Sequence, residues 1–104
     1  KEQACAIPVA DAGDGYDGYE TGDAVILDGC GSTKGDCGET IYEKGYIWFL
    51  LDKPPAAAAQ LNTEGNCITQ FLPDQPGEYE IGLIVYDQKT FFQSDLATTT
   101  VTVQ

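Results

Sequence analysis

The fold is decided by the stretch Pro73-Asp-Gln-Pro-Gly-Glu-Tyr-Glu-Ile-Gly-Leu-Ile-Val-Tyr-Asp87. Pro76-Gly77 forms a turn, and apolar residues then occupy alternate positions, at Tyr79, Ile81, Leu83 and Val85. This alternation predicts a β-strand with one buried face. A tyrosine two residues past such a turn, where a late strand opens, is typical of the tyrosine corner of a β-sandwich.

Short apolar segments separated by Gly, Asp and Pro continue on both sides of this stretch. Pro8 restricts a first strand to the edge of a sheet, and Trp48 is expected in the core. We expect strands at residues 6–10, 24–28, 45–51, 67–72, 79–86 and 98–103, a loop at 11–22, and long connections at 29–44 and 53–60. In a hairpin-like connection at 87–95, Phe91 and Phe92 are expected to pack back onto the sandwich. The sequence thus predicts a single all-β domain over residues 1–104, an antiparallel sandwich of about seven strands.

The composition excludes several classes of partner. The 104 residues carry a net charge of −12, with only five lysines and arginines together. Binding to nucleic acid or to an anionic membrane needs cationic side chains, so neither is expected. The longest strongly apolar run, residues 46–51, is far shorter than the ~20 residues of a membrane span, so no membrane insertion is expected. Because methionine is absent, we expect the domain to be excised from a longer, modular protein.

Four cysteines, at positions 5, 30, 37 and 67, occur in a chain without histidine. Structural zinc sites use closely paired cysteines, and no such pair is present. An even number of cysteines in a small β domain indicates two disulfides and an oxidising compartment. The predicted location is therefore extracellular, periplasmic or at the cell surface.

Two groups of residues in the loop at 11–22 are candidates for binding. Asp11, Asp14 and Asp17, with glycines between them, have the oxygen ligands that calcium prefers, although Asp and Gly also form ordinary turns. Tyr16 and Tyr19 are candidates for an exposed contact with carbohydrate or protein. No catalytic residues are identified, because a histidine-based triad is impossible here, and we expect no enzyme activity.

The order of motifs along the chain resembles the PKD (polycystic kidney disease) domain family. The residues concerned are Gly22 to Ser32, Tyr46-Ile-Trp48, Lys53-Pro54, Phe71-Leu-Pro-Asp74, Pro76-Gly-Glu-Tyr79 and Val85-Tyr-Asp87. The resemblance covers residues 7–103 and implies an immunoglobulin-like (Ig-like) β-sandwich. It also implies a non-catalytic module of secreted and surface proteins of bacteria and archaea, which serves as a spacer or binds proteins or polysaccharides.

The resemblance further implies a calcium site at one end of the sandwich. The positions that match the ligands of calcium-binding members are residues 4–6, Asp36, Glu39 and Asp87. In an Ig-like sandwich all four cysteines should lie at this same end. The preferred pairing is Cys5–Cys37 with Cys30–Cys67, in which the first bridge ties the segments that calcium ties elsewhere. The pairing Cys30–Cys37 with Cys5–Cys67 remains open.

The function expected from the sequence is a non-catalytic extracellular binding or spacer module. Its expected partners are neighbouring domains of the same polypeptide and an extracellular protein or polysaccharide, with calcium as the one candidate cofactor. The alternative is a structural role, as a stalk or as an assembly subunit of a surface layer or filament.

Overall fold

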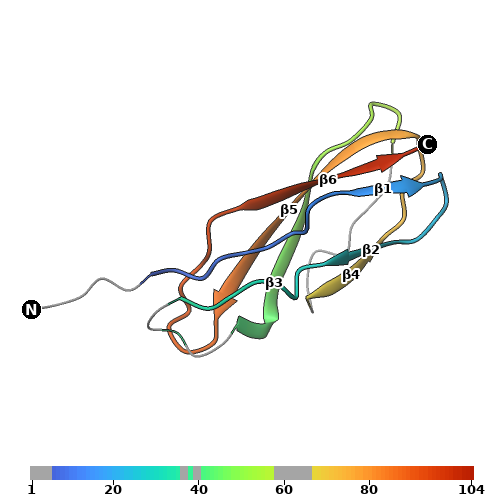
Figure 1. Ribbon diagram of the computed structural model, residues 1–104. Helices are drawn as coiled ribbons and strands as arrows, with labels where there is room; N and C mark the ends of the chain where they lie inside the picture. Colours follow the sequence, from blue (N-terminus) through green and yellow to red (C-terminus); the bar gives the residue numbers. More distant parts are fainter. Residues whose placement is uncertain (1–5, 36–37, 39–40, 58–66) are drawn as a thin grey trace, which may run out of the picture.

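The chain forms two β-sheets that pack face to face (Figure 1). The computed structural model describes residues 6–35, 38, 41–57 and 67–104, without the side chains at 43 and 44. Its strands are β1 (Tyr16–Tyr19), β2 (Val25–Asp28), β3 (Ile41–Asp52), β4 (Ile68–Phe71), β5 (Gly77–Asp87) and β6 (Ala97–Val103). One sheet has the order β1-β6-β5-β3 and the other pairs β2 with β4. The predicted all-β, Ig-like sandwich is confirmed. The described part of the chain has no helix long and apolar enough to cross a membrane.

Strand β5 is the centre of the larger sheet, as its alternating sequence predicts. It pairs antiparallel with β3 on one side and with β6 on the other. Its four predicted inward side chains are all fully buried. Trp48 of β3 stands opposite Leu83 and is also fully buried, so its expected place in the core is confirmed. The core cluster consists of Ala12, Val25, Leu27, Tyr46, Trp48, Ala57, Phe71, Tyr79, Ile81, Leu83, Val85, Val101 and Val103.

The tyrosine corner that the sequence predicts is present at the start of β5. The Tyr79 hydroxyl donates a hydrogen bond to the Gln75 carbonyl oxygen at 2.6 Å and accepts one from the Gln75 N–H at 3.0 Å. The Tyr79 ring lies edge-on to Phe71 of the other sheet, with the centroids 5.1 Å apart. One side chain therefore fixes the turn before β5 and joins the two sheets.

Tyr79→Phe is expected to lower the free energy of unfolding by about 1–2 kcal/mol, because both backbone groups of Gln75 lose their partner while the ring stays. Urea unfolding followed by Trp48 fluorescence measures the change. Tyr42→Phe is the matched control, since Tyr42 is 41% exposed, and should change the stability by less than about 0.5 kcal/mol. Equal effects of the two substitutions would contradict a role for the corner.

The smaller sheet is held at one end by a disulfide. Residues Val25–Asp28 pair antiparallel with Ile68–Phe71, and a bond joins Cys30 to Cys67 just beyond the paired region. The Gly29 N–H donates to the Cys67 carbonyl oxygen at 2.7 Å, which extends the pairing by one step. This bridge confirms half of the preferred pairing and excludes the alternative one. The predicted Cys5–Cys37 bridge lies outside the described residues.

The first strand differs from the expectation. No strand forms at residues 6–10, where Val9 makes an isolated bridge with Thr33, because Pro8 has no N–H to donate to a ladder. Instead β1 forms inside the stretch expected to be a loop. It pairs with β6 in parallel, so the larger sheet is mixed rather than purely antiparallel. A left-handed Gly18 (φ 81°) lies where the register of β1 shifts.

Candidate functional site

The connection between β5 and β6 begins with a turn built on a buried carboxylate. Asp87 is fully buried, and its Oδ1 accepts the N–H groups of Lys89 at 2.7 Å and Thr90 at 3.0 Å. The Phe91 N–H donates to the Asp87 carbonyl oxygen at 2.9 Å, and the Asp87 N–H donates to the Phe92 carbonyl oxygen at 3.1 Å. A single residue thus fixes the backbone of the whole turn.

Two phenylalanines leave this turn towards solvent. Phe91 is 70% exposed and Phe92 is 41% exposed, so the expectation that both rings pack back onto the sandwich is wrong. The backbone explains the outcome for Phe91, whose φ of 60° lies in the left-handed region. Bulky side chains rarely adopt this conformation, which glycine or asparagine usually provides at a turn. Of the described residues other than glycine, only Phe91 has a positive φ.

The segment after the turn is held to β5 by a serine. Ser94 is 4% exposed. Its Oγ accepts the Val85 N–H and its N–H donates to the Val85 carbonyl oxygen, both at 2.9 Å. Next to it, Gln93 forms a bridge with Tyr86, whose hydroxyl donates to Gln93 Oε1 at 3.2 Å. Hydrogen bonds of Asp87 and Ser94 therefore hold the backbone on both sides of Phe91 and Phe92.

A second pair of aromatic residues lies beside the turn. Tyr86 precedes Asp87 in β5, and Tyr42 of β3 is its neighbour, because a Cβ built on Gly45 would lie 3.1 Å from Tyr42 Cβ and 3.2 Å from Tyr86 Cβ. Tyr42 is 41% exposed. We call the group Tyr42, Tyr86, Phe91 and Phe92 the aromatic pole. It occupies the end of the sandwich at which the first described residues lie (Figure 1).

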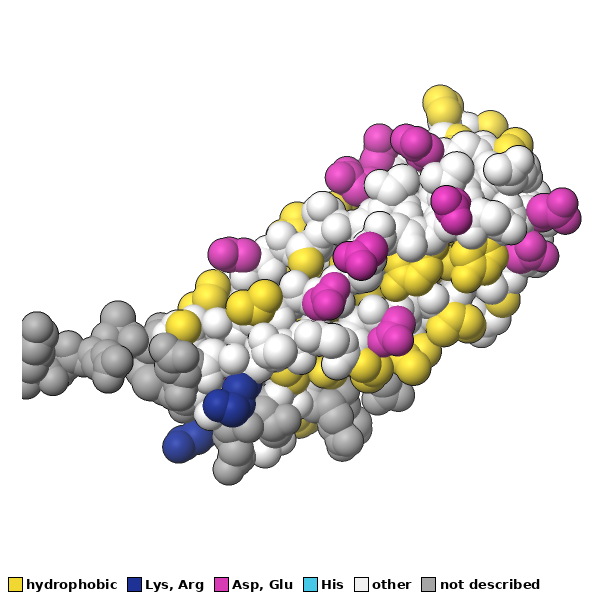
Figure 2. Space-filling view, viewed as in Figure 1, with side chains coloured by type: hydrophobic (Ala, Val, Ile, Leu, Met, Phe, Trp, Pro, Cys, Tyr) yellow, Lys and Arg dark blue, Asp and Glu magenta, His cyan; other side chains and the backbone are white. Residues whose placement is uncertain are grey.

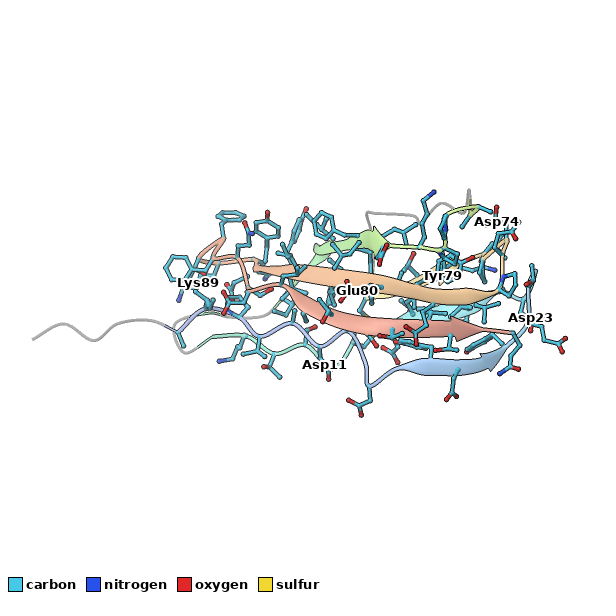
Figure 3. All side chains as sticks on the ribbon, turned by 90° about the horizontal axis from the view of Figure 1, so that it is seen from above. Asp11, Asp23, Asp74, Tyr79, Glu80 and Lys89 are labelled. Atoms are coloured by element: carbon cyan, nitrogen blue, oxygen red, sulfur yellow. A yellow bond between two sulfur atoms is a disulfide. The ribbon has the colours of Figure 1, made fainter. Side chains whose placement is uncertain are left out.

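The described charged side chains are distributed unevenly between the two ends of the molecule. Figure 2 shows Lys side chains at the end near the first described residues, while Asp and Glu side chains are spread along the rest of the visible face. Figure 3 places Lys89 at this same end and Asp23 and Asp74 at the opposite end.

The two tyrosines expected to contact a ligand make contacts within the fold, and ligand binding by them stays a prediction. Tyr16 and Tyr19 belong to β1, are half-buried and pack against the core cluster, so their placement in an exposed loop is wrong. The Tyr16 hydroxyl accepts the Asp28 N–H at 2.9 Å and donates to the Ala12 carbonyl oxygen at 3.1 Å. Because Asp28 belongs to β2, this hydroxyl joins the two sheets.

Burial raises the pKa of Tyr16 above its ordinary value of 10.0, and burial likewise raises the pKa of Tyr46. Both groups therefore keep their protons in the folded chain at a pH where the unfolded chain has lost them. The free energy of unfolding should be constant up to about pH 10 and should fall as the pH rises further, through the raised pKa values. Urea unfolding between pH 8 and pH 11.5 tests this expectation.

The matched variant is Tyr16→Phe, which removes the hydroxyl and its titration. It should be less stable than the parent at pH 8, because two hydrogen bonds are lost, but its stability should fall less steeply above pH 10. A slope identical to that of the parent would contradict a contribution from Tyr16.

The acidic candidates are not brought together as a cation site. Asp11 Oδ1 accepts the Gly13 N–H at 2.9 Å, which is the turn geometry that Asp commonly adopts, and Asp17 is exposed on β1. Within the described ranges no three Asp, Glu or Cys side chains, Asp14 included, form a group that could hold a metal ion. Asp36 and Glu39 of the calcium site implied by resemblance lie outside these ranges. Calcium binding with Asp87 as a ligand stays a prediction.

The aromatic pole was missed in the sequence because its signal is weak. Phe91-Phe92 follows the Asp-Gln-Lys-Thr turn, and adjacent phenylalanines in a connection are usually read as core residues. Adjacent residues of an extended segment point to opposite sides, however, so one core cannot take both rings. That alternation was the available signal.

No known family profile matches the sequence, and a search of curated proteins finds no match. Among solved structures, the chain is similar to the solution structure of the PKD domain from KIAA 1837 protein. The TM-score is 0.71 at 24% sequence identity, covering 100% of this chain and 92% of that one.

A nucleoside hydrolase-related hypothetical protein from Saccharophagus degradans, described as associated with carbohydrate metabolism, also matches. Its TM-score is 0.71 at 18% identity, and the match covers 97% of this chain but 26% of that chain. At these identities the likeness concerns the fold. The chain therefore has a PKD-like fold.

Proposed function

We propose that the chain is a non-catalytic extracellular module that binds an extracellular protein or polysaccharide through its aromatic pole and so positions the domains beside it. The observation that carries the proposal is Phe91, an exposed ring on a strained backbone in a turn held by buried Asp87. Strained conformations persist where the surroundings enforce them, and they are concentrated at functional sites. Rigid aromatic rings supply contact area at a low cost in entropy.

Two further observations support a modular role. A similar fold makes up about a quarter of the longer protein from Saccharophagus degradans. The first described residues and the C-terminus lie at opposite ends of this chain (Figure 1), which suits a domain placed in line between others. The Cys30–Cys67 disulfide favours an oxidising compartment, hence an extracellular, periplasmic or cell-surface location.

The test is retention of the oxidised chain on insoluble collagen, cellulose and chitin, each with calcium and with a chelator. We expect retention on one matrix and a loss of about 10-fold or more in affinity for Phe91→Ala, because a central aromatic contact is worth more than 1 kcal/mol. Ile26→Ala is the matched control, since Ile26 is 47% exposed on β2 in the other sheet. Retention that Phe91→Ala leaves unchanged would contradict the aromatic pole as the contact surface. A loss with chelator would support calcium as a cofactor.

The alternative function, a stalk or an assembly subunit of a surface layer or filament, is favoured by the opposite placement of the two ends. It predicts no retention on any of the matrices. The same experiment therefore separates the two functions.

A further inference from the structure

Strand β3 forms an open edge of the larger sheet. It pairs with β5 on one side, and no other described strand pairs with its free side. Figure 3 shows β3 at the margin of this sheet, on the far side of β5 from β6 and β1. An edge strand presents N–H and C=O groups to which another strand can bond, so natural proteins usually keep such edges short, charged or irregular.

The other edges in the described part of the chain have this protection. Strand β1 has four residues, among them Asp17 and the left-handed Gly18 (φ 81°). Both strands of the smaller sheet also have four residues each. By contrast, β3 has twelve residues, and its residues 46–51 are uncharged, apolar and free of proline. A run of this composition readily accepts a further strand.

The hydrogen bonds of β5 show which backbone groups of β3 lie on the free side. The Val85 N–H and C=O groups both bond to Ser94, on the side of β5 away from β3. Adjacent residues of a strand direct these groups to opposite sides, so Val85 and every second residue before it direct theirs away from β3. The residues of β3 opposite them therefore direct their own N–H and C=O groups to the free side, and these are Tyr46, Trp48 and Leu50.

The open edge ends beside two carboxylates. Asp52 stands opposite Glu80, and both side chains are exposed. The ammonium group of the next residue, Lys53, donates a hydrogen bond to the Ala57 carbonyl oxygen. Like charges directly opposite each other destabilise a sheet, so a cation from a partner beside Asp52 and Glu80 would relieve their repulsion.

Charge also selects among the possible occupants of this edge. The outward N–H and C=O groups can bond to any extended polypeptide. A second copy of the chain is disfavoured, because two molecules of net charge −12 repel each other. The same charge, and the two carboxylates at the end of the edge, favour an extended segment that is neutral or basic.

We propose that the open edge of β3 binds an extended segment of another polypeptide, which adds to the larger sheet as an antiparallel strand. Uncharged residues of the segment bond to Tyr46, Trp48 and Leu50. Because the strands are antiparallel, the first residues of the segment lie at the Asp52 end, where Lys or Arg meets Asp52 and Glu80. The aromatic pole takes no part, so this proposal is independent of the proposed function.

The test is hydrogen exchange, followed residue by residue by NMR on the oxidised chain with and without a short acetylated peptide. The peptide begins with two lysines and continues with alternating valine and threonine. At saturation, exchange at the N–H groups of Tyr46, Trp48 and Leu50 should slow by about 10-fold or more, because each gains a hydrogen bond. The N–H groups of Ile47 and Phe49, which face β5, are the matched controls and should change little.

A proline substitution tests the backbone contact. Leu50→Pro removes one outward donor, at a position where an edge strand tolerates proline because the N–H does not bond within the sheet. It should weaken binding of the lysine peptide by about 10-fold. Phe91→Ala is the control, and it should leave binding of this peptide unchanged.

The exposed carboxylates give a second test, which does not depend on whether Leu50→Pro folds. The parent chain should bind the lysine peptide about 10-fold more tightly than a peptide that begins with two glutamates instead. Asp52→Asn combined with Glu80→Gln should abolish this preference.

Several results would overturn the proposal. One is unchanged exchange at Tyr46, Trp48 and Leu50 in the presence of the lysine peptide, and another is equal slowing at Ile47 and Phe49. Loss of peptide binding in Phe91→Ala would move the contact to the aromatic pole. Protection that rises with the concentration of the chain, without peptide, would assign the edge to a second copy.

Discussion

Replacing Cys30 and Cys67 together by serine is expected to lower the free energy of unfolding by about 4 kcal/mol. The bridge joins residues 37 positions apart, and closing a loop of that length removes this much conformational entropy from the unfolded chain. Domains of this size have a total stability of about 5–15 kcal/mol, so the double-serine variant should lose a large part of its stability.

The loss should be concentrated in the smaller sheet. It contains just two described strands, with Val25–Asp28 paired to Ile68–Phe71, and short two-stranded sheets are marginal without support. The disulfide closes the loop that carries β3 between these strands. We expect hydrogen exchange at Leu27 and Thr69, which form a hydrogen-bonded pair of the β2–β4 ladder, to accelerate more in the double variant than exchange at Ile81 and Leu83 of β5.

Serine substitution is preferable to a chemical reductant, which would also reduce any Cys5–Cys37 bridge. Cys5→Ser with Cys37→Ser is the matched control, and thiol labelling of the parent chain tests that predicted bridge directly. A loss below about 1 kcal/mol for the Cys30 and Cys67 variant would contradict the stabilising role of the bridge.

The centre of the fold could be predicted from the sequence because its signals are local. The turn at Pro76-Gly77, the alternation after it and the tyrosine at its start all act within one strand, and the structure confirms each of them. The same is true of Trp48, because an isolated tryptophan in an apolar run has few alternatives to the core.

Strand β1 could not be predicted because its partner is remote. Tyr16 pairs with Val101 near the far end of the chain, and nothing in the Asp- and Gly-rich stretch around it signals a parallel neighbour. Its two tyrosines therefore resembled exposed loop residues, although one joins the sheets through its hydroxyl. Tertiary context overrides local propensity most easily in such short segments.

The aromatic pole was missed for a different physical reason. Burial of Phe91 was expected from its hydrophobicity, but the hydrogen bonds of Asp87 fix the backbone of the turn and so decide where the ring points. A buried carboxylate must be satisfied by such bonds, and the cost of leaving it unsatisfied exceeds the gain from burying one exposed ring. A sequence shows the hydrophobicity of a residue but not this competition.

Trp48→Ala is the second substitution expected to have a large effect, with a loss of about 3–5 kcal/mol in the free energy of unfolding. Trp48 is fully buried, stands opposite Leu83 and packs against Gly29, whose added Cβ would lie 3.0 Å from the indole ring. Removing the ring leaves a cavity between the two sheets, which the rigid strands around it can fill only partly. Urea unfolding must be followed by far-UV circular dichroism, because the substitution removes the sole tryptophan.

Trp48→Phe distinguishes the contribution of the ring's volume to stability from the contribution of the indole N–H group. Among the residues that the structure describes, Trp48 Nε1 has no hydrogen-bond partner. Phenylalanine therefore gives up no hydrogen bond with them and avoids the cost of burying an unpaired donor, so its loss should be well below that of alanine, at about 1–2 kcal/mol. Ile26→Ala, at an exposed position, should change the stability by about 0.5 kcal/mol or less. If Trp48→Phe is as damaging as Trp48→Ala, the indole N–H contributes to stability and the cavity argument is wrong.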